Sequence, residues 1–134
     1  MTKSVSTTIA LLLAAIASIG ASSVAAHHSW STHYDLSRST SVSGTLGRII
    51  FRNPHSALVL NVNNESGRQE LWTVEWASPQ RLRERGVTER TLRVGDTLFV
   101  SGNPHRDAKV KSVRALSVRR DDGTEVGNDE PAGR

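Results

Sequence analysis

Short runs in which apolar and polar residues alternate fill the chain from about residue 40 onward, and this period of two predicts β-strands. The clearest run is QELWTVEW at 69–76, where Trp72, Val74 and Trp76 fall on one face and the residues between them fall on the other. Comparable runs predict further strands at 41–52, 55–62, 97–101 and 109–119. The pattern therefore predicts a small β-protein with five strands.

Turn-forming residues separate these runs. Residues 53–54 (Asn-Pro) end the first strand, because proline cannot donate to a strand ladder and Asn-Pro favours a turn. Residues 63–67 (NNESG) are expected as a hairpin loop, and residues 102–104 (GNP) are expected to break the fourth strand. Gly44 and Gly47 permit a bend or bulge within the first strand.

One short helix is expected between the third and fourth strands. Ser78 is a favourable N-cap, Pro79 suits the first helical position, and Gly86 ends a helix that runs through Arg85. The order strand, strand, strand, helix, strand, strand is that of an OB-fold, a small and partly open β-barrel. The predicted fold is therefore all-β with one short helix: an OB-fold-like five-stranded barrel. A β-sandwich would need more strands and a parallel α/β fold more helices.

The first 26 residues have the pattern of a cleaved signal peptide. Lys3 precedes an apolar run at 9–19, and small residues follow at 22–26. The run is too short to span a membrane, which needs about 20 apolar residues, and the absence of a polar face disfavours an N-terminal core helix. Cleavage is expected after Ala26, or one residue earlier after Ala25. The protein is thus expected to be exported to the periplasm, and without another long apolar run it is not expected to be membrane-embedded.

The remaining chain divides by composition. We expect a signal peptide at 1–26, a histidine-rich leader at 27–40, the barrel domain at 41–126 and a flexible C-terminal tail at 127–134. The sequence contains no cysteine, which excludes disulfides, thiolate nucleophiles and cysteine-type zinc sites. The net charge of +4 arises from scattered basic residues and indicates a solvated surface. Export and the few aromatic residues argue against nucleic acid as a partner.

Two of the five histidines occur in a repeated tripeptide, Asn-Pro-His, at 53–55 and 103–105. These tripeptides fall in the loops between strands 1 and 2 and between strands 4 and 5, which flank the usual ligand face of an OB-fold. His55 and His105 are therefore expected to converge on one end of the barrel. The alternative is that Asn-Pro only forms turns and each histidine is simply exposed.

The other histidines lie at the expected new N-terminus. Cleavage after Ala26 makes His27 the first residue, so that its α-amine and imidazole can chelate one ion, with His55 or His105 completing a copper site. Cleavage one residue earlier places His28 third, in a pattern that forms a square-planar nitrogen site for Cu(II) or Ni(II). Both routes predict copper, held by His27, His28, His55 and His105. The alternative is a flexible polar leader without a ligand.

His33 and Glu75 are weaker candidate ligands. Catalysis has less support, because the sequence contains neither G-x-S-x-G nor H-E-x-x-H and its carboxylates are scattered. A copper oxygenase is disfavoured because so small a domain leaves little room for a substrate surface. We therefore predict a binding module that is not an enzyme and has no catalytic residues. The competing hypothesis is an envelope interaction or small-ligand module that uses the barrel face around Trp72 and Trp76 without metal.

The sequence also resembles domain-of-unknown-function family 6152, a family of small exported bacterial proteins. The resemblance covers about residues 26–123 and rests on His-His-Ser after the signal peptide, on Asn53-Pro54-His55, and on further matches at Asp35, Gly44, Trp72, Ser78-Pro79, Leu82, Gly86, Gly95-Asp96 and Arg106-Asp107. The family usually has glycine after Arg-Asp, where this chain has Ala108, so the turn between strands 4 and 5 is expected to differ. The resemblance implies an exported β-barrel, with no known activity and no catalytic residues to transfer.

Overall fold

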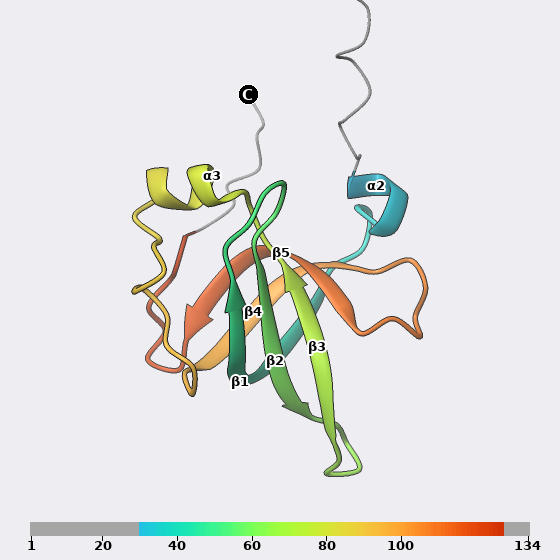
Figure 1. Ribbon diagram of the computed structural model, residues 1–134. Coiled ribbons are helices and arrows are strands. Elements are labelled where there is room, and N and C mark those ends of the chain that lie inside the picture. The colour runs from blue at the N-terminus through green and yellow to red at the C-terminus, as the bar shows by residue number, and fades with distance from the viewer. Residues whose placement is uncertain (1–29, 128–134) are drawn as a thin grey trace, which may run out of the picture.

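Five strands form a closed β-barrel (Figure 1), and buried and exposed residues alternate along much of their length. The strands are β1 (Thr40–Ile50), β2 (Ala57–Asn63), β3 (Gln69–Glu75), β4 (Thr97–Pro104) and β5 (Ser112–Arg120). This computed structural model describes residues 30–127. The predicted signal peptide, His27, His28 and all but the first residue of the predicted C-terminal tail lie outside the described residues.

The barrel has the strand order β1-β2-β3-β5-β4, and β4 pairs again with β1. β3 and β5 run parallel, whereas the other neighbouring strands are antiparallel. A short helix lies between β3 and β4 in the chain. The structure therefore confirms the predicted all-β, OB-fold-like five-stranded barrel.

The inward-facing residues of the strands form one apolar core. Leu46, Leu60, Val74 and Leu98 are essentially inaccessible to solvent. Trp76 is also buried, and Trp72 packs against the core from a half-buried position. The tryptophan face of β3 is therefore largely core.

Helix α3 (Pro79–Glu84) adds Leu82 to this core. The Ser78 hydroxyl accepts a hydrogen bond from the Arg81 backbone N–H, and Pro79 occupies the first turn. Gly86 follows the helix with φ of 77°, a left-handed conformation that favours glycine. The predicted start and end of this helix are thus confirmed. Neither α3 nor the other described helix, α2 (Trp30–His33), is long and apolar enough to span a membrane.

The prediction that residues 102–104 break the fourth strand is wrong, because β4 continues through Pro104. A bulge between Ser101 and Gly102 shifts the register with β5 and lets Asn103 and Pro104 remain paired. The two strands come very close at this bulge. A Cβ atom on Gly102 would lie 1.8 Å from the backbone oxygen of Arg114, so only glycine fits.

Strand β5 begins at Ser112 rather than at Lys109. The residues before it form a turn, in which the Asp107 carboxylate accepts the Lys109 N–H and the Asp107 carbonyl accepts the Val110 N–H. This aspartate-centred turn takes the chain out of the ladder and shortens the strand. It also determines where His105, just before the turn, is presented.

Candidate functional site

Helix α2 lies beside the barrel and is attached to the β4–β5 connection (Figure 1). The Arg106 backbone N–H donates to the His33 carbonyl at 2.8 Å, and the Arg106 Nε donates to the Ser31 carbonyl at 2.7 Å. Asp35 continues this attachment through an N–H donated to the Pro104 carbonyl at 3.0 Å. The chain from residue 30 onward is therefore held against the barrel, which the sequence did not indicate.

Tyr34, directly after α2, is the buried anchor of this attachment. It forms a β-bridge with His105, its side chain is only 1% exposed, and its hydroxyl oxygen lies 2.8 Å from the Ser112 hydroxyl oxygen. Burial raises the pKa of Tyr34 to about 12; the Ser112 hydrogen bond opposes this rise, and the negative charge of Glu75 adds to it. The phenol therefore stays protonated at neutral pH.

The two Asn-Pro-His tripeptides differ in the role of their asparagine. Asn53 is exposed, whereas Asn103 is buried. The Asn103 amide nitrogen donates to the Arg38 carbonyl at 2.9 Å, and its oxygen accepts from Arg114 Nη1 at 3.0 Å. Asn103 thus connects the segment after α2 to β4 and β5. The two asparagines therefore have different roles, whereas the histidines of both tripeptides contact α2.

His105 faces α2 with its ring beside His33 and Tyr34. The ring centroids of His105 and His33 are 6.2 Å apart, with planes inclined by 25°, and the Tyr34 ring meets His105 edge-on at 5.6 Å. The Nδ1 atom of His105 lies 3.1 Å from the Asp107 backbone nitrogen and 3.3 Å from the Asp107 carbonyl oxygen. The Asp107 N–H donates to Nδ1, which places the proton of the neutral ring on Nε2. In the other tautomer Nδ1 donates to the Asp107 carbonyl, and the lone pair of Nε2 is then available to a ligand.

His55 contacts the other end of α2. Its ring stacks on the Trp30 indole, with ring centroids 3.9 Å apart, and the Arg114 guanidinium lies 5.0 Å from the centroid of the same indole. The His55 Nδ1 lies 3.8 Å from a carboxylate oxygen of Glu75. His55 is half-buried by these neighbours, so the reading in which the histidine is simply exposed does not describe it.

Glu75 connects the two histidine loops. It faces His55, acts electrostatically on Tyr34, and lines a cavity of about 310 Å³ together with His33 and His105. The remaining residues around this cavity are Tyr34, Thr73, Val110, Lys111 and Ser112. The two loops therefore meet at one end of the barrel, as expected, but they meet through α2 and Glu75. We call this region, defined by Trp30, His33, His55, Glu75 and His105, the α2 site.

The described residues do not complete a metal site by themselves. Within residues 30–127, no three histidine, aspartate or glutamate side chains gather closely enough to hold one ion. His27 and His28, the two candidate ligands that precede Trp30, lie outside the described residues. A metal site at α2 would therefore need donors from that segment.

Sequence reasoning missed Trp30 as part of this site, and it missed Tyr34, Arg106 and Ser112 as the residues that attach α2 to the barrel. Their partners lie about 25 to 80 positions away in the chain, as in the Tyr34–Ser112 pair separated by 78 residues. No local period or turn signal reports a contact of that range. The available signs were the chain's single tyrosine in a polar leader and the family match at Arg106-Asp107.

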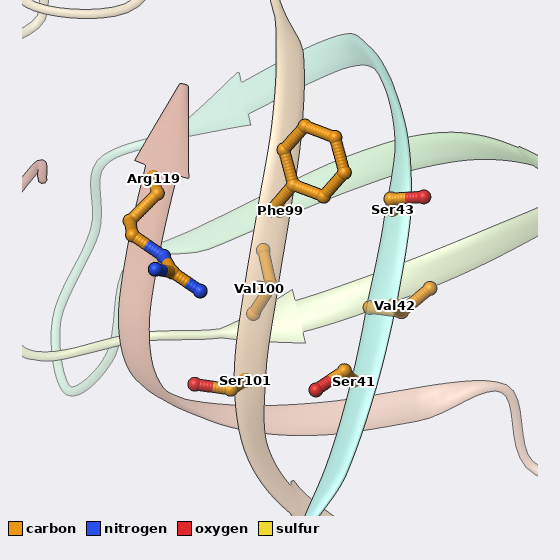
Figure 2. Close-up of a pocket in the computed structure, with 7 residues that line it drawn as sticks. All are labelled: Ser41, Val42, Ser43, Phe99, Val100, Ser101 and Arg119. Atoms are coloured by element: carbon orange, nitrogen blue, oxygen red, sulfur yellow. The ribbon is translucent and has the colours of Figure 1, made fainter. Parts of the chain in front are cut away.

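A separate shallow hollow of about 200 Å³ lies on the outside of β1, β4 and β5 (Figure 2). Phe99 and Arg119 are exposed beside Ser41 and Ser43 there, whereas the valines beneath belong to the core. Arg119 is the only ionisable residue among those lining it. The hollow therefore lacks the several neighbouring ionisable side chains that the α2 site has.

Comparison with known proteins gives a family and a likeness to solved structures. No curated protein sequence matches the chain. Among solved structures, a crystal structure of a mitochondrial single-stranded DNA-binding protein from S. cerevisiae, Rim1, is similar with a TM-score of 0.48 and 9% identity, over 62% of this chain and 92% of that one. The model of the family of unknown function DUF6152 matches residues 14–114, most of the chain. This protein is therefore a member of the DUF6152 family.

Proposed function

We propose that this protein is an exported, periplasmic copper-binding protein without enzymatic activity, and that copper binds at the α2 site through His27, His28 and the loop histidines His55 and His105. The observation that carries the proposal is the position of α2, which contacts His55 at its start and His105 at its end. Trp30, the first described residue, stacks on His55, and α2 runs from there to His105, so we assign the preceding histidines to this site.

Covalent geometry supports this arrangement. His28 and His27 precede Trp30 by two and three residues. Because an extended chain covers at most about 3.6 Å per residue, their α-carbons lie within about 7 and 11 Å of that of Trp30. The Trp30 ring is stacked on His55, so N-terminal donors within that radius have a loop histidine in reach.

The surroundings of His105 also suit a metal ligand. Histidines that bind metals usually donate their second ring N–H to a backbone carbonyl or carboxylate, which fixes the tautomer and the ring orientation. In this structure His105 Nδ1 accepts the Asp107 N–H at 3.1 Å. A metal bound at Nε2 would move the ring proton to Nδ1, and the Asp107 carbonyl, 3.3 Å away, would then accept it. His33 and Glu75 border the same cavity and are additional candidate donors.

The donor types favour the oxidised ion. Imidazole nitrogen, amine nitrogen and carboxylate oxygen are the donors near α2, and the chain has no cysteine and one methionine, Met1. Cu(I) prefers the thiolate and thioether sulfur that this site lacks, whereas Cu(II) prefers nitrogen and oxygen. The proposal is therefore specific for Cu(II).

Competitive titration of the mature protein with Cu(II) tests the proposal. His105→Ala and His55→Ala should each be compared with Glu89→Ala, an exposed carboxylate that pairs with Arg83 away from α2. We expect at least one loop-histidine variant to bind Cu(II) about tenfold or more weakly and Glu89→Ala to bind as the parent does. Equal, weak binding by all of them would contradict the proposal.

The competing function is binding of a small ligand or envelope partner without metal. Lys111 favours it, because its ammonium lies 5.5 Å from the Trp72 ring centroid and the same side chain lines the cavity at α2. Trp76, in contrast, is 1% exposed and cannot contribute to a binding face. Metal-independent binding that is lost in Lys111→Ala, but retained when every histidine is replaced, would favour this alternative.

A further inference from the structure

Another cavity, distinct from the α2 site and from the hollow in Figure 2, is lined by three arginines and shares no residue with the α2 site. It has a volume of about 400 Å³ and lies between the loop that follows α3 and the end of β5. Its lining residues are Arg90, Thr91, Arg93, Asp96 and Arg120. Neither the family assignment nor the proposed copper site accounts for this concentration of positive charge.

The loop that carries two of these arginines is firmly attached to the barrel. The Asp96 carboxylate accepts the Arg93 backbone N–H at 2.9 Å, which closes a turn. Gly95 and Asp96 then form two backbone hydrogen bonds with Leu46 of β1, each 2.8 Å long. Leu92, between the two arginines, is buried in the core. The backbone that presents Arg90 and Arg93 is therefore preorganised.

Arg120 is the best-fixed cation of the cavity. It is half-buried at the end of β5, and its Nη2 donates a hydrogen bond to the Thr91 carbonyl oxygen. This bond uses one of the five guanidinium N–H groups and sets the direction of the others. The end of β5 and the arginine loop are thereby joined across the cavity.

The charges around the cavity do not balance. Three guanidinium groups face one carboxylate, that of Asp96, and an oxygen of that carboxylate already accepts the Arg93 backbone N–H. Asp122 acts electrostatically on Arg120 and Glu89 on Arg90, but neither carboxylate is among the residues that line the cavity. The lining residues therefore carry two excess positive charges. Like charges held in one hollow repel, and a bound anion removes this repulsion.

We infer that the cavity lined by Arg90, Arg93 and Arg120 binds a compact phosphate group with two negative charges. Guanidinium groups bind phosphate through paired N–H donors, which gives geometric selectivity over a spherical anion such as chloride. A phosphate of this class occurs both as the free ion and as the phosphomonoester headgroup of a lipid. The inference stands independently of the copper proposal, since the two sites share no residue.

Titration with inorganic phosphate, followed by NMR of the backbone amides and the arginine Nε–H groups, tests the inference. Chloride at matched ionic strength gives the reference for general screening. We expect saturable shifts at residues 88–96 and at Arg120 with phosphate, and none that saturate with chloride. Arg93→Gln should weaken phosphate binding about tenfold, because it removes one of the three guanidinium groups that line the cavity. The variant should fold normally, since the Arg93 side chain is exposed.

Arg83→Gln is the matched control. Arg83 is also exposed and lies in α3, just before the arginine loop, but its guanidinium pairs with Glu89 at 2.8 Å and does not line the cavity. Arg83→Gln should bind phosphate as the parent does. Identical shifts with phosphate and chloride, or equal weakening by Arg83→Gln and Arg93→Gln, would overturn the inference.

Vesicles identify the source of the phosphate. Phosphatidylcholine vesicles with and without phosphatidic acid, which has a phosphomonoester headgroup, should be tested beside the free ion. Binding to the phosphatidic acid vesicles that is lost in Arg93→Gln supports a lipid phosphate, and binding of the free ion alone supports a soluble one. Binding of neither would overturn the inference.

Discussion

The indole ring of Trp30 lies against the imidazole ring of His55, with ring centroids 3.9 Å apart and planes inclined by 23°. This stack joins the start of helix α2 to the β1–β2 loop. On the other side of the helix, Tyr34 forms a β-bridge with His105. The short helix is thus held between His55 of the β1–β2 loop and His105, which directly follows β4.

The Trp30–His55 stack should matter for copper binding as well as for stability. We expect Trp30→Ala to lower the free energy of unfolding by about 1 kcal/mol, the order of one aromatic pair, and to weaken Cu(II) binding because the N-terminal segment loses its attachment. Trp30→Phe keeps an aromatic ring and should retain most of both. Denaturant unfolding and competitive copper titration measure the two effects. Unchanged copper affinity in Trp30→Ala would show that the Trp30–His55 stack is not needed for copper binding, contrary to this prediction.

Tyr34 predicts a specific pH dependence at high pH. The folded protein holds the phenol proton up to a pKa of about 12, whereas the unfolded chain releases it near 10. The contribution of the protonated Tyr34 phenol to the free energy of unfolding is therefore fully present below pH 10 and is lost as the pH rises from 10 towards 12. Tyr34 is the only tyrosine, so an ultraviolet titration of tyrosinate reports it alone. A titration midpoint near the ordinary value in the folded protein would contradict its burial.

The parts of the fold that the sequence predicts correctly depend on local chemistry. The alternation at 69–76 places Val74 and Trp76 in the core, and Ser78 with Gly86 marks the ends of α3. The position of β4's end depends instead on pairing with Arg114 across a bulge, which no local rule for Asn-Pro includes. The packing of α2 depends on residues 104–112, about 75 positions away. Of the candidate site, the convergence of the two loops was therefore predictable and the helix between them was not.

Gly102 should tolerate no side chain. In Gly102→Ala the new Cβ would meet the Arg114 backbone oxygen, so the β4–β5 bulge would have to open, at a cost of about 3 kcal/mol. Gly47→Ala is the matched control in β1, because its nearest contact is the flexible end of the Asn61 side chain, which can move away. Thermal unfolding compares the two. Equal losses would show that the close approach at Gly102 does not determine stability.

The oxidation state of copper should control affinity. Because the donors near α2 are nitrogen and oxygen, we expect Cu(II) to bind more tightly than Cu(I), and reduction by ascorbate in the presence of a Cu(I) chelator to remove the metal. Glu75→Gln should weaken Cu(II) binding less than His105→Ala, since Glu75 is the weaker candidate donor. Absorption of the Cu(I)–chelator complex measures the transfer. Retention of Cu(I) against the chelator would contradict the proposed donor set.

Copper binding as proposed requires an N-terminus beginning at His27 to supply the donors that residues 30–127 lack. A decisive measurement is a Cu(II) titration against a chelating competitor, in which the protein beginning at His27 is compared with the same protein carrying three additional N-terminal residues. The three residues separate the α-amine from His27, place neither His27 nor His28 first or third, and leave every described contact of α2 unchanged. We predict stoichiometric, submicromolar binding that is lost in the extended protein. Weak and equal binding by both proteins would contradict the proposed copper site at the N-terminus.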